Sequence, residues 1–136
     1  MTERCVFCGA LEFERADGRR RCAVCGWFVG DGPDPDLPPP VVEVVYYLRY
    51  ADRIKIGTSA HPRRRLSAIR HEELLAFERG GRALEQARHA EFADVREGGE
   101  WFTAVPALVA HAAALAGGAD PWRTYTRWLA EARRPS

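Results

Sequence analysis

Residues 41–57, VVEVVYYLRYADRIKIG, decide the fold of this 136-residue chain. The first ten are a β-branched and aromatic run of the kind that forms a buried strand. Ala51-Asp52 separates this run from a second short one, RIKIG, which Gly57 closes. The two runs predict a β-hairpin at the start of the main domain.

The residues that follow alternate between helical and extended patterns. Pro62 suits the first turn of a helix, and residues 74–77 (LLAF) read as a third strand. A helix is predicted over residues 82–95, and GGEWF then leads to the alanine-rich helix VPALVAHAAALA. We therefore predict an α/β fold for residues 41–117, a small β-sheet covered by helices.

All four cysteines lie near the start of the chain, in two Cys-x-x-Cys pairs separated by thirteen residues: Cys5, Cys8, Cys22 and Cys25. A two-residue gap lets both thiolates of a pair meet one tetrahedral ion, and a glycine follows each pair and permits the tight turn around the sulfurs. Asp17-Gly18 indicates a hairpin turn between the pairs. Residues 1–30 are predicted to be a zinc ribbon with structural Zn²⁺. Two disulfides or a redox pair are the alternatives. Disulfides fit an intracellular chain poorly, and a redox Cys-x-x-Cys would occur once, near a βαβ pattern.

Three further segments, in and around these two modules, also allow a prediction. Arg19, Arg20 and Arg21 lie beside the second cysteine pair, where they can contact phosphate. Residues 31–40 are acidic and proline-rich, which predicts a linker. Residues 118–136 predict an amphipathic helix, and we expect its aromatic stripe to pack on the main domain.

Composition and charge limit the classes of protein to which the chain can belong. The chain is 46% hydrophobic and 29% charged, which allows a globular core, and its net charge of +1 does not identify a nucleic-acid binder. Residues 49–70 carry seven cations and one acid, whereas residues 71–100 carry four arginines and eight acids. A site that handles phosphate and a metal cation needs such a pairing, although a solvated charged face looks similar. No run is long and apolar enough for a membrane span or a signal peptide, so we expect a cytoplasmic protein without a membrane partner.

Five motifs in order resemble the GIY-YIG nuclease superfamily, in the phage and bacterial branch whose second motif reads KIG. The resemblance covers residues 44–115 and rests on VYYL, KIG, PRRRL, ALEQARHAEF and GEWF. It implies an α/β sandwich that acts as a metal-dependent DNA endonuclease, with RNA as the other conceivable substrate.

The resemblance also implies site residues. They are Tyr47 as the functional tyrosine, Lys55 in the second motif, Arg65 for phosphate, Glu85 for Mg²⁺ or Mn²⁺, and His89 one helical turn after Glu85. Because Tyr46 and Tyr47 point to opposite faces of a strand, the pattern alone gives them equal claim, and only the resemblance selects Tyr47. Arg63, Arg64 and Arg70 are candidate phosphate contacts or solvated charges.

The second motif departs from the family pattern because Lys55 replaces its tyrosine. An ammonium on the neighbouring strand would favour the phenolate of Tyr47 and lower the pKa of that side chain. Lys55 can equally orient a phosphate. Glu100 reads as a cap, an ion-pair partner or a supporting group.

These observations predict a metal-dependent DNA endonuclease whose zinc ribbon targets nucleic acid or a protein partner. Two other classes of function fit the same sequence. One is a nucleic-acid-binding or regulatory protein that has lost catalysis on the same fold, and the other is a zinc-dependent protein-interaction adaptor. Steep salt dependence of DNA binding would argue against the adaptor.

Overall fold

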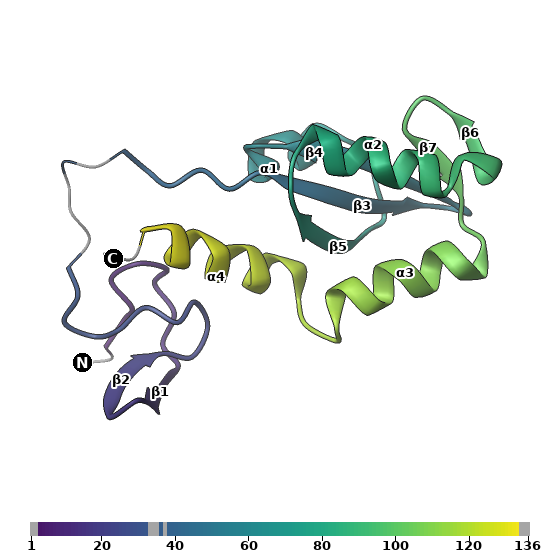
Figure 1. Ribbon diagram of the computed structural model, residues 1–136. Coiled ribbons are helices and arrows are strands. Elements are labelled where there is room, and N and C mark those ends of the chain that lie inside the picture. Colours follow the sequence, from purple (N-terminus) through teal and green to yellow (C-terminus); the bar gives the residue numbers. More distant parts are fainter. Residues whose placement is uncertain (1–2, 33–35, 37, 134–136) are drawn as a thin grey trace. The chain divides into compact units, whose positions relative to one another are not determined.

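A computed structural model describes residues 3–32, 36 and 38–133 of the chain. The chain divides into two compact units (Figure 1). The first consists of Met1–Val41 together with Trp122–Ser136, and the second is Val42–Pro121. No helix among the described residues is both long enough and apolar enough to cross a bilayer.

The second unit is built on an antiparallel sheet with strand order β5-β3-β4-β7-β6. Its strands are β3 (Val44–Tyr50), β4 (Arg53–Ser59), β5 (Glu73–Arg79), β6 (Arg96–Gly98) and β7 (Trp101–Thr103). The predicted hairpin is confirmed as β3 and β4, which pair from Tyr50 opposite Arg53. Ala51 adopts φ 55° in the turn between them.

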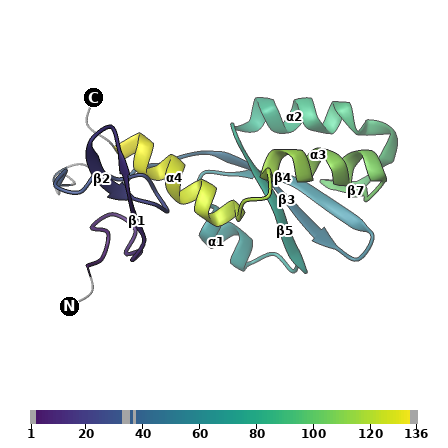
Figure 2. The same cartoon turned by 90° about the horizontal axis from the view of Figure 1, so that it is seen from below.

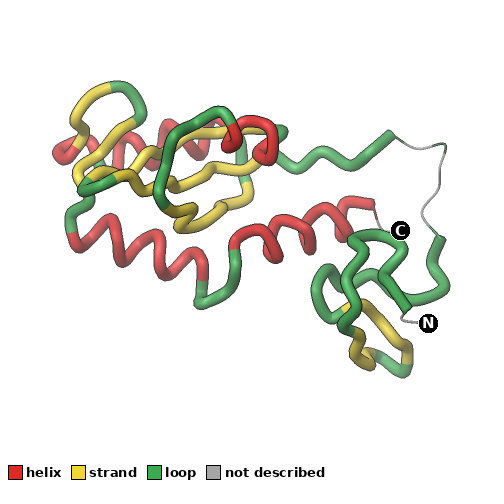
Figure 3. The backbone as a smooth tube through the Cα atoms, turned by 180° about the vertical axis from the view of Figure 1, so that it is seen from behind, coloured by secondary structure: helices red, strands yellow, loops and turns green. Residues whose placement is uncertain are grey.

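Helices complete this unit, as the red and yellow segments of Figure 3 show. They are α1 (Pro62–Ser67), α2 (Arg82–Glu91), a 3-10 turn (Ala93–Val95) and α3 (Pro106–Ala116). The helix predicted over residues 82–95 therefore ends earlier, and the tighter turn carries the chain into β6. The predicted α/β fold class is confirmed by the sheet and helices of the described residues.

Both faces of this sheet are buried at β3, and one hydrophobic cluster lies on the face to which Tyr47 points. Val45, Tyr47, Ile54 and Ile56 point to this face from β3 and β4, and they pack with residues of α3 that include Leu108. All five are 0% exposed. Burying each such side chain contributes about 1.5–3 kcal/mol to folding, so this face is fixed by packing.

The first unit contains the ribbon, whose hairpin is β1 (Phe13–Ala16) and β2 (Arg19–Cys22). The predicted turn is confirmed, since Asp17 and Gly18 both have positive φ, at 52° and 74°. A left-handed pair of this kind matches the twist of the two strands it joins.

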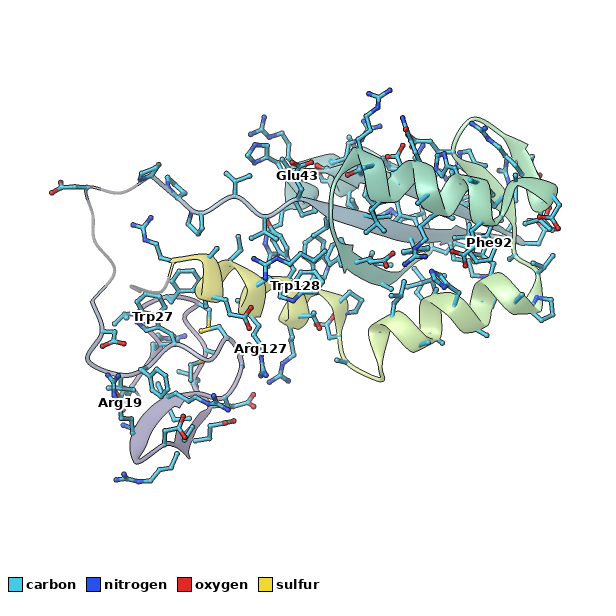
Figure 4. All side chains as sticks on the ribbon, viewed as in Figure 1. Arg19, Trp27, Glu43, Phe92, Arg127 and Trp128 are labelled. Carbon is cyan, nitrogen blue, oxygen red and sulfur yellow. The ribbon has the colours of Figure 1, made fainter. Side chains whose placement is uncertain are left out.

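Helix α4 (Pro121–Arg133) lies beside the ribbon in Figures 1 and 2. Ala130 is buried in the cluster that contains the cysteines and Trp27, and Nη2 of Arg127 donates to Ala23 O at 3.1 Å (Figure 4). Ala130 and Arg127 of this helix therefore contact the ribbon, and the packing of its aromatic stripe on the main domain stays a prediction.

Two predicted segments extend beyond the part of the chain that the structure describes. Residues 33–35 and 37 of the linker expected at 31–40 lie outside it, and so do residues 134–136 of the segment expected at 118–136.

Candidate functional site

The register of β3 against β4 decides which side chains can meet. Tyr46 lies opposite Gly57 and Leu48 lies opposite Lys55. Directly opposed residues of an antiparallel pair point to the same face, and faces alternate along a strand. Tyr46 and Lys55 therefore share one face, and Tyr47 points to the other.

Tyr46 is the tyrosine of this face, and only 1% of its surface is exposed. Burial raises the pKa of its phenol, and a hydrogen bond with the Arg65 guanidinium opposes that rise. Glu85 and Glu100 also act on the phenol electrostatically. Helix α1 thus supplies a cation to the phenol, while Glu85 of α2 and Glu100 supply negative charge nearby.

Gly57 leaves the space that the phenol fills. A Cβ placed on Gly57 would lie 2.4 Å from Tyr46 Oη and 2.9 Å from Glu100 Oε2. Both distances are far inside van der Waals contact, and the buried ring of Tyr46 has no room to retreat.

We expect Gly57→Ala to lower the free energy of unfolding by about 1–3 kcal/mol, the usual cost of overpacking a buried site. Urea denaturation followed by circular dichroism measures this change. Gly32→Ala is the matched control, because a Cβ at Gly32 meets nothing within 4 Å. Equal stability of Gly57→Ala and the wild type would contradict the packing described above.

Glu85 and Glu100 border a cavity on the surface of this unit. It has a volume of about 520 Å³ and is lined by residues of α2 and the β6–β7 turn, including Glu85, His89 and Glu100. Burial and the negative charge of Glu100 raise the pKa of Glu85. Nζ of Lys55 lies 3.4 Å from Glu100 Oε2. The two carboxylates are therefore offset by Lys55 and by Arg82 and Arg96, which line the same cavity.

His89 is held by the sheet rather than free to rotate. Its Nε2 lies 2.7 Å from Ile56 O, and a carbonyl oxygen only accepts, so Nε2 carries the hydrogen. Its ring also packs against Phe102, with centroids 5.0 Å apart. His89 thus contributes to the wall of the cavity.

Tyr47 is not brought into this group. Its hydroxyl donates to Glu78 Oε1 at 3.0 Å and lies 3.1 Å from His111 Nε2, within the core on the other face of the sheet. Burial raises the pKa of Tyr47, and Glu78 raises it further. The expectation that Lys55 would lower this pKa is wrong, because the two side chains point to opposite faces. The residue that joins Lys55, Arg65 and Glu85 is Tyr46.

The sequence pattern alone did not decide which of Tyr46 and Tyr47 is the functional tyrosine. A signal that distinguishes them was present in the sequence. A tyrosine ring that lies across the neighbouring strand needs a glycine opposite it, because any Cβ there would clash with the ring. In a two-residue turn at Ala51-Asp52, Gly57 falls opposite Tyr46. Glu100 was left undecided because nothing local places it beside Glu85.

The remaining predicted phosphate contacts fall into two groups. Arg63, Arg64 and Arg70 are exposed on or just after α1. The three arginines of β2 are engaged with acids: Arg19 with Asp31, Arg20 with Glu3, and Arg21 with Glu14. A phosphate would have to compete with these ion pairs on the ribbon.

The four cysteines of the ribbon form one cluster, and none is in a disulfide. Their sulfur atoms all lie within 4.8 Å of one another, with two Sγ–Sγ distances of 3.6 Å. A tetrahedral site with Zn–S bonds of about 2.3 Å separates its sulfurs by about 3.8 Å. Backbone amides of Phe7, Val24 and Trp27 each approach a sulfur at 3.4 Å, as thiolates require. The cluster can therefore bind a zinc ion.

Comparison with known proteins gives one match. The model of a family described as T5orf172 domain matches residues 43–116. No curated protein and no solved structure matches the chain. This match corrects the resemblance stated above, because the matching family is distinct from the GIY-YIG superfamily. It is nevertheless associated with nuclease-like and endonuclease-like proteins.

Proposed function

Because the chain belongs to the T5orf172 domain family, we propose that it is a metal-dependent DNA endonuclease that hydrolyses phosphodiester bonds. Membership itself indicates a nucleic-acid-related function. One observation carries the finer proposal: Arg65, Glu85 and Glu100 all act on the buried phenol of Tyr46. A phenol that bonds to a guanidinium and feels two nearby carboxylates brings together the groups that phosphodiester hydrolysis needs.

Arg65 binds the phosphate in this proposal. Its side chain reaches the phenol from α1, so the guanidinium is already held at the site before substrate arrives. A planar, permanently charged fork can grip two non-bridging oxygens and stabilise the charge that builds up on them. Lys55 adds a second cation on the same face, partly neutralised by Glu100.

Glu85, with Glu100 beside it, would hold Mg²⁺ or Mn²⁺. These hard cations prefer carboxylate oxygens and keep several waters, so one or two carboxylates and the substrate phosphate suffice. Burial and then repulsion from Glu100 raise the pKa of Glu85, and a cation held between the two carboxylates would relieve that repulsion. The bound ion would supply charge neutralisation at the departing oxygen.

Tyr46 orients the attacking water. Its hydroxyl accepts a hydrogen bond from Arg65, and the same oxygen can accept a second hydrogen bond from the attacking water and fix its position. The phenol lies close enough to Arg65 for one phosphate to touch both. The zinc-bound ribbon would target the enzyme to nucleic acid or to a protein partner.

A pair of single-atom deletions tests this assignment. Tyr46→Phe should lower the rate of Mg²⁺-dependent plasmid cleavage by about 10²–10⁴-fold, the usual contribution of a positioned acid or base. Tyr47→Phe removes the same atom from the next residue, and it should leave the cleavage rate within about threefold while lowering stability by about 1–3 kcal/mol, because Glu78 loses a buried donor.

Gel assays of supercoiled plasmid measure the rates, and thermal unfolding measures stability. A wild-type protein that binds DNA but never cuts it would favour the nucleic-acid-binding alternative. Cleavage lost in Tyr47→Phe and kept in Tyr46→Phe would reverse the roles proposed here.

A further inference from the structure

A second hollow lies in the Val42–Pro121 unit, apart from the carboxylates. Its volume is about 250 Å³, and it is lined by Tyr50, Arg53, Arg70 and Trp101. Two of these residues are aromatic and two are cationic. The endonuclease proposal uses none of them in the cleavage step.

The aromatic rings and guanidiniums of this hollow alternate in contact. Cζ of Arg53 lies 4.9 Å from the ring centroid of Trp101, and Cζ of Arg70 lies 5.3 Å from that of Tyr50. Neither ring is fully buried. Aromatic faces interleaved with fixed cations are how proteins bind single-stranded nucleic acid, with bases on the rings and phosphates on the cations.

Lys55 connects this hollow to the site of Tyr46 and Glu85. Lys55 pairs with Trp101 across β4 and β7, and its Nζ lies 5.5 Å from the Trp101 ring and 3.4 Å from Glu100 Oε2. Arg53 is two residues from Lys55 on the same face, a separation of about 7 Å along a strand. Lys55 therefore lies between the ring of Trp101, which lines this hollow, and Glu100, which lines the other one.

We propose that this hollow binds an unpaired nucleotide of single-stranded DNA, with its base stacked on Trp101 and its phosphates against Arg53 and Arg70. That the nucleotide adjoins the bond to be cut rests on the proposed endonuclease function. A base inside a duplex is already stacked and paired, so only an unpaired base can reach the ring. Base stacking is stronger than an exposed cation–π contact, so the base can displace Arg53 from the ring.

Binding to ordinary and abasic strands of equal length tests the proposal. Fluorescence anisotropy is measured with the full zinc-loaded chain and without added Mg²⁺, so cleavage plays no part in the readout. Trp101→Leu keeps the apolar bulk and removes the ring, and Trp101→Phe restores a ring. We expect Trp101→Leu to raise the Kd for the ordinary strand about 5–100-fold and to leave the Kd for the abasic strand unchanged.

Trp101→Phe should recover most of the affinity for the ordinary strand. Arg53→Ala and Arg70→Ala should weaken the binding of both the ordinary and the abasic strand. Each substitution should also reduce the salt dependence of binding by about one counterion. Equal loss for the ordinary and abasic strands in Trp101→Leu would overturn base stacking, and so would a loss of the same size for a blunt duplex. A loss seen with an RNA strand and absent with DNA would overturn the assignment to DNA.

Failure of the endonuclease proposal would look different. In that case the Trp101 effect on binding persists while no Mg²⁺-dependent cleavage is found. If instead the hollow has no role in binding, cleavage can persist while Trp101→Leu leaves both affinities unchanged.

Discussion

Removing zinc with a chelator is expected to unfold the ribbon and to release α4 from it. The hydrophobic cluster of this unit is organised around the four sulfurs, with Trp27 and Ala130 packed against them. So few residues bury too little apolar surface to fold without a staple. A structural Zn²⁺ contributes about 10–16 kcal/mol in small finger peptides, which exceeds the net stability of a domain of this size.

Hydrogen exchange read out by residue is the measurement that checks this prediction. Amides such as Gly9 and Gly26, which donate to Cys5 O and Cys22 O, should lose protection on chelation, whereas the β3–β4 pairing should keep its own. Returning Zn²⁺ should restore the protection. Unchanged protection of residues 3–32 in the zinc-free chain would show that the ribbon does not depend on the ion.

Substitution separates loss of a ligand from any side effect of the chelator. Cys22→Ser should produce the same loss of protection, because a neutral hydroxyl is a poor replacement for a thiolate at zinc. Ala23→Ser introduces the same side chain at the next position, where the backbone amide donates to Glu12 O and the backbone carbonyl accepts from Arg127. It should leave the ribbon folded.

The features that could be predicted from the sequence are those set by short-range patterns. The turn at Asp17-Gly18 and the two cysteine pairs each require particular residue types within a few positions, and both were found where predicted. The β3–β4 hairpin is similar, because its two apolar runs flank one short turn. Local geometry determines these elements, so local sequence is enough to find them.

The candidate site could not be predicted in the same way, because it depends on contacts between residues that are distant in the sequence. Whether Tyr46 or Tyr47 lies beside Arg65 is decided by which face of the sheet each helix covers, and α3 covers the face to which Tyr47 points. Glu100 meets Glu85 only because β7 folds back beside β4. The resemblance to a family with a similar motif selected Tyr47, and the register of the sheet places Tyr46 beside Arg65 instead.

Replacing Glu85 by Gln is expected to lower the cleavage rate about as strongly as Tyr46→Phe does. Gln has nearly the same shape as Glu and keeps one carbonyl oxygen, but it has no charge to hold a divalent cation. Loss of the ion removes several kcal/mol of transition-state stabilisation, and about 4 kcal/mol corresponds to a rate loss of about 10³-fold. The rate should recover little at high Mg²⁺, because Glu100 alone is partly neutralised by Lys55.

Stability should move in the opposite direction, which separates this loss from simple unfolding. Burial and Glu100 raise the pKa of Glu85, so the charged carboxylate is less favourable in the folded protein than in the unfolded chain. At a pH above that pKa, Glu85→Gln removes an unfavourable charge and should unfold at the same temperature as the wild type or higher. Cleavage rates and thermal unfolding of the same preparation provide both readouts.

Glu91→Gln supplies the matched control for Glu85→Gln. Glu91 is on the same helix and loses the same charge, but it pairs with Arg88 outside the cavity that Glu85 lines. It should cut at the wild-type rate. If Glu85→Gln also cuts at the wild-type rate, the carboxylate does not hold the catalytic ion. If both variants lose activity and stability together, the loss reflects damage to α2, and the metal-binding role of Glu85 loses its support.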